Sequence, residues 1–119
     1  MTQEDKELLL KDLCARLPYG IRAFYYGVED EIESITLDGY VKIGKYSLPI
    51  ERIKPYLFPL SSMSEEQSKE YHELIGGMFG TSALINFEIL EDFFHKNHLD
   101  YRGLIKMGIA IDATNLNIY

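Results

Sequence analysis

Apolar residues at the start of the chain recur every three or four positions, which is the spacing of a helix with one buried face. They are Leu9, Leu10, Leu13, Cys14 and Leu17. Thr2 precedes them and can cap the helix, and Pro18 follows them and ends it. The pattern therefore predicts an N-terminal helix that packs on a sheet. Cys14 is the only cysteine and falls on the apolar face, so we expect an inert, buried thiol.

The hydrophobic period becomes two after residue 20, which indicates β-strands. Along residues 21–26 both alternating sets of side chains are largely apolar. One face therefore belongs to the core, and the other needs a helix or a partner to cover it. We expect a turn through residues 29–31 and then a second strand, in which the spacing of Ile32 and Ile35 predicts a β-bulge.

Turn residues divide the next stretch into further short strands. Asp38-Gly39 has the sequence of a two-residue hairpin turn, and Gly44-Lys45 can turn the chain a second time. Pro49 favours one short helical turn over residues 49–54, and residues 56–60 form an extended apolar segment. A strand meander followed by such a turn also occurs in SH3-like barrels, an analogy of fold that carries no function.

Two longer helices are predicted in the second half of the chain. Ser64 and Gln67 have the spacing of a capping box, and the glycine-rich residues 76–80 form the exit of the helix that they open. Its apolar face consists of Tyr71, Leu74, Ile75 and Met78. A second helix covers about residues 84–96, and Asn97 can terminate it. Its buried stripe consists of Phe87, Leu90, Phe93 and Phe94.

The segment Asp100-Tyr101-Arg102-Gly103 places a carboxylate, an aromatic ring, a guanidinium and a bare backbone side by side. Asp100 can accept a backbone hydrogen bond from Arg102 or Gly103, which predicts a short helix over residues 101–107. In the first turn of that helix the macrodipole disfavours the Arg102 cation by about 0.3–1 kcal/mol. A carboxylate from another element or a tyrosine ring would offset this cost. The alternative is an anion or a partner's carboxylate that docks beside Asp100, so the segment is a candidate structural clasp or interaction site.

The elements together predict an α+β fold with an N-terminal helix, a small antiparallel sheet and two to three C-terminal helices. Gly108 can end the short helix in a left-handed conformation, and residues 109–111 can add a last strand. The sequence contains no internal repeat, low-complexity segment or domain boundary, so residues 1–119 form one domain. A domain of this size buries about two-thirds of its unfolded surface.

The formal net charge is −7 and is concentrated in the second half of the chain. Residues 1–60 contain 10 acidic and 8 basic residues, whereas residues 61–119 contain 9 acidic and 4 basic ones. Phosphate backbones are bound mainly by Lys and Arg, so this balance argues against direct nucleic-acid binding. No apolar run approaches the length of a membrane span, and the acidic N-terminus is the reverse of a signal peptide. We therefore expect a cytoplasmic protein without membrane contact.

A group of possible metal ligands occurs near the end of the second helix. It consists of Glu88, Glu91, Asp92, His95 and His98. Their spacing places several of them on one helical side, and carboxylates and imidazoles are common metal ligands. A solvated helix face explains the same residues without a metal, and His98 falls beyond the expected helix end. We assign no metal and keep a metal-dependent enzyme as the weakest alternative.

No pattern of nucleophilic or cofactor-dependent catalysis is present. The serines lie at expected caps and turns, and the sequence has neither a Gly-x-Ser-x-Gly elbow nor a phosphate-binding glycine loop after a strand. We therefore predict a non-enzymatic protein without a cofactor.

Several segments resemble a family of small uncharacterised proteins that occur in gut bacteria, their prophages and other mobile elements. They are Asp12-Leu13-Cys14-Ala15-Arg16-Leu17-Pro18-Tyr19-Gly20, Lys54-Pro55-Tyr56-Leu57, Ser61-Ser62-Met63-Ser64-Glu65-Glu66, and Asn97-His98-Leu99-Asp100-Tyr101-Arg102-Gly103-Leu104-Ile105 with Gly108. The family's motifs carry no known activity, so the resemblance transfers no catalytic or binding residue. A mobile-element context implies a small protein that binds another protein.

The leading hypothesis is therefore a protein-interaction module that contacts a partner protein or a second copy of itself. It is based on the strand with two apolar faces and on the many tyrosines, nine in this chain. The alternative is an acidic phage-type accessory protein that mimics the charge of nucleic acid and occupies a nucleic-acid-binding protein.

Overall fold

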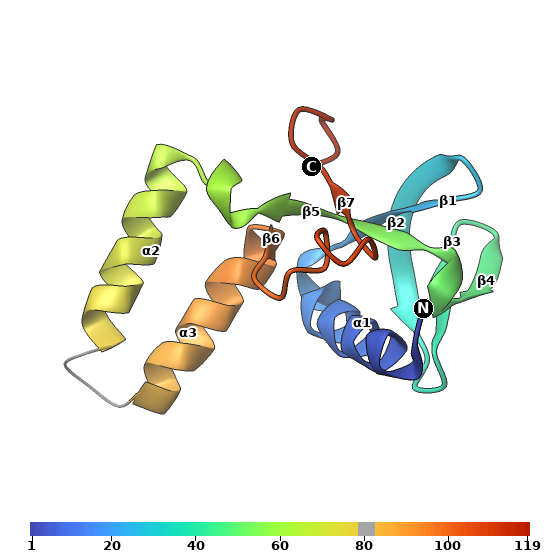
Figure 1. Cartoon of the computed structure of the whole chain (residues 1–119), viewed down its shortest axis with the longest axis horizontal. Helices are drawn as coiled ribbons and strands as arrows, with labels where there is room; N and C mark the ends of the chain where they lie inside the picture. The colour runs from blue at the N-terminus through green and yellow to red at the C-terminus, as the bar shows by residue number, and fades with distance from the viewer. Residues whose placement is uncertain (79–82) are drawn as a thin grey trace.

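The computed structural model describes residues 1–78 and 83–119 and is elongated, with extents of 46 × 30 × 23 Å. The helix α1 (Gln3–Arg16) packs against the sheet, and the helices α2 (Glu65–Met78) and α3 (Ala83–Lys96) form an arm beside it (Figure 1). The predicted α+β class, with its N-terminal helix, antiparallel meander and C-terminal helices, is confirmed. No helix in the described part of the chain is long and apolar enough to cross a membrane.

Helix α1 begins with the capping predicted at Thr2. The Thr2 hydroxyl accepts a hydrogen bond from the Asp5 amide, and the Asp5 carboxylate accepts one from the Thr2 amide. The prediction for Cys14 is wrong, because its side chain is exposed. The buried face contains Leu9, Leu13 and two charged residues, and Cys14 follows Leu13 by one position, about 100° further around the helix. The short 3₁₀ turn η1 (Leu17–Tyr19) then ends α1 at the predicted proline.

The strands β1 (Arg22–Tyr25) and β2 (Val28–Ile35) form a hairpin whose turn differs from the prediction. Tyr25 pairs with Val28, so the chain turns at Tyr26 and Gly27, and residues 29–31 belong to β2. Both turn residues have positive φ, at 45° and 79°, as a type I′ turn requires. A run of acidic residues is typical of a turn, but residues 29–31 lie in β2, where pairing with β1 satisfies the hydrogen bonds of their backbone.

The strands β3 (Tyr40–Ile43) and β4 (Tyr46–Pro49) complete the antiparallel meander. The β-bulge is confirmed, since the register of β2 and β3 shifts between Ile32 and Ser34. The Gly44-Lys45 turn is also confirmed, because it joins Ile43 to Tyr46, which pair with each other. The prediction of a two-residue turn at Asp38-Gly39 is wrong. Thr36 and Tyr40 are joined by a three-residue loop, in which Gly39 has a φ of 90° and donates to the Thr36 carbonyl.

The strand β5 (Lys54–Pro59) follows the 3₁₀ turn η2 (Ile50–Arg52) and holds the two parts of the molecule together. The sheet order is β4-β3-β2-β1-β5-β6, and β7 (Ile111–Asp112) also pairs with β5. The predicted extended apolar segment is thus a central strand, antiparallel to β1 and parallel to β6 (Leu99–Asp100) and β7. The main core lies between this sheet and α1.

The arm has a small aromatic core of its own. The turn η3 (Leu60–Ser62) leads into α2, where Ser64 and Gln67 form the predicted capping box. Phe93, Phe94 and Leu99 are buried between the helices, whereas Phe87 of the predicted stripe is 53% exposed. The predictions for the Met78 side chain and for the part of the glycine-rich exit within residues 79–82 lie outside the described residues.

The predicted helix over residues 101–107 is not formed. These residues make a series of turns between β6 and β7, closed by isolated hydrogen bonds such as that from the Met107 amide to the Gly103 carbonyl. Gly103 has a φ of 80°, and a helix cannot continue through such a left-handed residue. Gly108, with a φ of 81°, adopts the left-handed conformation that the sequence predicts for it. Asp100 still accepts hydrogen bonds from backbone amides, but from those of Leu104 and Ile105 instead of Arg102 or Gly103.

Candidate functional site

The Asp12 carboxylate joins two arginines from distant parts of the chain. Arg16, one turn later on α1, donates from Nε to Asp12 Oδ2 at 2.8 Å. Arg102 donates from Nε to Asp12 Oδ1 at 3.0 Å. The side chains of Asp12 and Arg16 are fully buried, and that of Arg102 is 17% exposed. Each carboxylate oxygen therefore has a charged donor, as a buried anion requires.

The Arg16 guanidinium also fixes the start of the C-terminal segment. Its Nη2 donates to the Leu99 carbonyl at 2.7 Å, so α1 is bonded directly to β6. Its Nη1 is buried and has no hydrogen-bond partner among the described residues. Arg16 thus connects α1 with β6 at the point where the arm rejoins the sheet.

The Tyr101 ring fills the space between the arginines and the arm. Its centroid lies 4.8 Å from the Arg102 guanidinium carbon and 5.6 Å from that of Arg16. The Phe94 ring stacks on it with centroids 4.8 Å apart. The tyrosine hydroxyl bonds His95 Nε2 at 2.8 Å. Burial, and then the charge of Arg16, lower the pKa of His95, whereas burial raises the pKa of Tyr101.

Asp100 organises the backbone of the segment that follows. Its two carboxylate oxygens accept from the amides of Leu104 and Ile105, each at 2.9 Å. Asp100 is buried, and Leu104, which enters the main core, is fully buried. The four residues singled out in the sequence thus differ in role: Asp100 and Gly103 shape the turns, and Tyr101 and Arg102 contact α1 and α3.

His98 is enclosed by the last residue of the sequence. The Tyr119 ring stacks on the His98 ring with centroids 3.6 Å apart. The Tyr119 hydroxyl donates to the Tyr56 carbonyl at 2.8 Å and accepts from the Arg22 amide at 2.9 Å, on β5 and β1. Burial and the charge of Arg16 lower the pKa of His98 to about 4, and burial raises the pKa of Tyr119 to about 12.

The candidate metal ligands of the sequence are not brought together. His95 bonds Tyr101, and His98 faces Tyr119, while Asp92 accepts from the Tyr19 hydroxyl at 3.1 Å. Within residues 1–78 and 83–119 no group of three or more His, Cys, Asp or Glu side chains could hold a metal ion.

Three tyrosines gather where the β1–β2 and β3–β4 turns meet; Tyr26 and Tyr46 are exposed there, whereas Tyr25 is buried. The rings of Tyr26 and Tyr46 lie edge to face with centroids 5.5 Å apart. The rings of Tyr25 and Tyr46 have the same arrangement, with centroids 5.9 Å apart. Val28 lies beside them, and together they line a shallow hollow of about 390 Å³. We call these four residues the tyrosine patch.

Tyr26 is unusual in both backbone and exposure. Its φ of 45° is left-handed, a conformation that costs a residue with a side chain about 1–2 kcal/mol. Asn or Gly is the usual residue at such a turn position. The Tyr26 side chain nevertheless points outward and is 62% exposed. A strained turn thus holds an exposed aromatic ring at this position.

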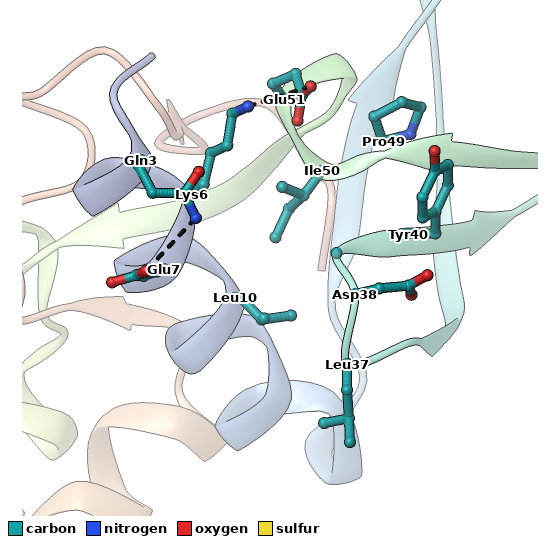
Figure 2. A pocket seen from close by; sticks show the side chains of 11 residues that line it. Gln3, Lys6, Glu7, Leu10, Leu37, Asp38, Tyr40, Pro49, Ile50 and Glu51 are labelled. Atoms are coloured by element: carbon teal, nitrogen blue, oxygen red, sulfur yellow. Dashed lines mark hydrogen bonds and ion pairs between the residues drawn. The ribbon is translucent and has the colours of Figure 1, made fainter.

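A larger groove, of about 490 Å³, lies at the opposite end of β2. It is formed by the first turns of α1, the loop between β2 and β3, and the start of η2 (Figure 2). Leu10 and Ile50 face into it, and charged side chains surround them.

Sequence reasoning missed the Asp12–Arg16 pair and the enclosure of His98 by Tyr119. The first left a signal, since an acid and a base four residues apart within an apolar stripe form an ion pair on the buried side of a helix. The second left none, because only the tertiary fold brings residues 98 and 119 together. No protein-family model, curated protein or solved structure matches this chain.

Proposed function

We propose that the protein is a non-enzymatic, cytoplasmic interaction module that binds another protein through the tyrosine patch. The observation that carries this proposal is Tyr26, a strained residue whose ring is 62% exposed. Strained backbone conformations of this kind cluster at functional sites such as ligand clamps.

The chemistry of the patch suits protein recognition. Tyrosine is enriched in the centres of protein interfaces because its ring buries a large area with little loss of side-chain entropy, and its hydroxyl can bond polar groups. Asp30 and Lys45 border the same hollow and supply a polar rim. Two tight turns hold the patch, so little ordering is needed on binding.

The ionisable groups of the interior support a structural role for the Asp100–Gly103 segment. Asp12 is shared by two arginines, Asp100 is bonded by two amides, and the His95 ring is bonded to Tyr101. None of these three groups borders either hollow described above. We assign the segment to the scaffold that joins α1, β6 and the arm.

One observation favours the charge-mimic alternative. The two helices of the arm expose several carboxylates, namely Glu65, Glu66, Glu73, Glu88 and Asp92. An acidic arm of this kind could occupy the basic surface of a nucleic-acid-binding protein, and such binding would weaken steeply with salt. The same experiment separates the two proposals.

The experiment is affinity capture from the source cell, followed by binding measurements with the purified partner. Tyr26→Asn combined with Tyr46→Ser removes the patch while keeping a residue that tolerates positive φ. We expect this variant to lose binding of the partner protein. The control variant Phe87→Ser, which removes an exposed ring from α3, should still bind it.

If the variant with Tyr26→Asn and Tyr46→Ser still captures the partner protein, the proposal is contradicted. If the retained protein binds nucleic acid and is lost with Glu66→Gln combined with Glu73→Gln, the arm is the contact surface and the charge-mimic alternative holds. Circular dichroism and denaturant melts establish that each variant is folded.

A further inference from the structure

The groove beside α1 is preformed, and an apolar floor lies between its charged walls. Ile50 at the base is 2% exposed, and Leu10 from α1 points toward it across the groove (Figure 2). The volume of about 490 Å³ is enough for one or two large side chains. Because these residues also pack on the main core, the floor is part of the rigid body of the protein.

The loop that forms one wall is held by its own hydrogen bonds. The Thr36 hydroxyl donates to the Asp38 carboxylate and accepts from the Tyr40 amide at 3.0 Å. The backbone of Thr36 pairs with that of Tyr40 at 2.9 Å. This fixed loop presents Leu37, which is 93% exposed, at the mouth of the groove. Leu37 contributes almost nothing to the core, so its apolar surface is free for contact with another molecule.

The charges around the groove are predominantly acidic. Glu7 stands on the α1 wall and Asp38 on the loop wall, and both are exposed. Lys6, the only basic residue among the described residues that line the groove, is 3.6 Å from Glu51 and pairs with it. Two carboxylates on opposite walls therefore have no cation within the lining.

We propose that this groove binds a peptide segment of a partner protein in which a large apolar side chain is flanked by Lys or Arg. The apolar side chain would lie on Leu10 and Ile50 and contact Leu37, and the flanking cations would face Glu7 and Asp38. The charges disfavour a symmetric contact with the groove of a second copy, because it would bring like charges opposite each other. They equally disfavour an anionic lipid surface or a phosphate backbone.

This site is independent of the tyrosine patch, which lies at the other end of β2. Either surface can therefore fail in experiment without affecting the other.

The test uses the full chain, labelled with ¹⁵N, and short synthetic peptides. The probe has Leu-Phe at its centre with Lys and Arg on both sides. One control peptide has Glu in place of the flanking cations, and a second has Ser-Ser at its centre. We expect saturable amide shifts within residues 3–10, 37–40 and 50–51 with the probe, and none at matched concentrations of either control.

Variants of the protein then separate the two contributions. We expect two variants to lower the affinity for the probe peptide by about tenfold each: Leu37→Ser, and Glu7→Gln combined with Asp38→Asn. The second variant should also remove the salt dependence of probe binding. Leu116→Ser and Glu73→Gln are matched controls, since both residues are exposed and lie outside the groove. These controls should leave the affinity unchanged.

Three results would overturn the proposal. The first is binding of the Glu-flanked peptide as tight as that of the probe. The second is shifts spread over the acidic arm, which would show general attraction between charges. The third is a change of the groove amides with protein concentration alone, which would assign the groove to self-association.

Discussion

Asp12 and Arg102 are 90 positions apart in the sequence and form an ion pair with an Nε to Oδ1 distance of 3.0 Å. The pair connects the middle of α1 to the turn that follows β6. Asp12 is fully buried and is also bonded to Arg16. Its carboxylate therefore pairs with one arginine from α1 and with one from the turn after β6.

We predict that Arg102→Ala lowers the free energy of unfolding by about 1–3 kcal/mol, because Asp12 loses one of its two charged donors but keeps Arg16. Arg102→Lys should recover only part of this loss, since an ammonium cannot reproduce the position of the guanidinium over the Tyr101 ring. Denaturant melts measure both, with the exposed Lys106→Ala as the control. An effect no larger than that of the control would show that the ion pair is solvated and the clasp is not structural.

Asp12→Ala should be more damaging than Arg102→Ala, with a loss of about 3–5 kcal/mol, because it leaves the buried Arg16 cation without its counter-ion. The double variant should cost less than the sum of the two single changes, since both remove the same interaction. A double-mutant cycle of unfolding free energies measures this coupling. Strict additivity would contradict the shared role of Asp12.

Asp100→Ala removes the acceptor of two buried or partly buried backbone amides. We expect a loss of about 2–3 kcal/mol in the free energy of unfolding, the range for hydrogen bonds to a charged group. Asp100→Asn keeps one carbonyl oxygen and should cost less. Hydrogen exchange of the Leu104 and Ile105 amides should accelerate in the alanine variant ahead of global unfolding, and unchanged protection would contradict the assignment.

Acid should destabilise the protein through His98. The pKa of His98 is about 4 in the folded chain and 6.5 for an ordinary histidine. Between these values the unfolded chain binds a proton that the folded chain does not, so stability falls as the pH drops from about 6.5 to about 4. We expect a loss of about 2 kcal/mol after allowance for partial solvent screening of the ring.

Melts between about pH 7 and about pH 4 check this dependence against two variants. His98→Asn should flatten it, because Asn tolerates the φ of 57° at this position and does not titrate. His72→Asn is the control, since His72 is exposed. A steep dependence that survives His98→Asn would assign the effect to other groups, of which His95 is the first to test.

Cys14 should react with a disulfide reagent in the native protein, because its side chain is exposed. The rate should be close to that measured in denaturant, and Cys14→Ser should abolish the reaction with little effect on stability. Protection of the thiol until unfolding would restore the buried position predicted from the apolar stripe.

Local sequence determined the elements whose signals lie within a few residues. The sequence predicts the cap at Thr2, the capping box at Ser64, the bulge after Ile32 and the turn at Gly44, because each depends on side chains that bond or pair with near neighbours. The order of helix, meander and helices followed from the periodicity of apolar residues, which sets the class of the fold.

The tertiary structure decided which apolar residues are buried and what the polar ones contact. Cys14 and Phe87 belong to apolar stripes, yet the sheet and the neighbouring helix cover an adjacent part of each helix surface. The turns after Asp100 replace the expected helix because Gly103, inside that helix, adopts a positive φ. These outcomes depend on contacts between distant segments, whose geometry no local pattern encodes.

The candidate surfaces illustrate the same division. The sequence marked Arg102 as an arginine that needs a partner, but only the fold selects Asp12 from nineteen acidic residues. The tyrosine patch and the groove each combine residues from separate turns or elements, so neither has a signature in the sequence. Charge and composition restricted the function to classes, and the arrangement of exposed side chains in space defined the two surfaces proposed to carry it.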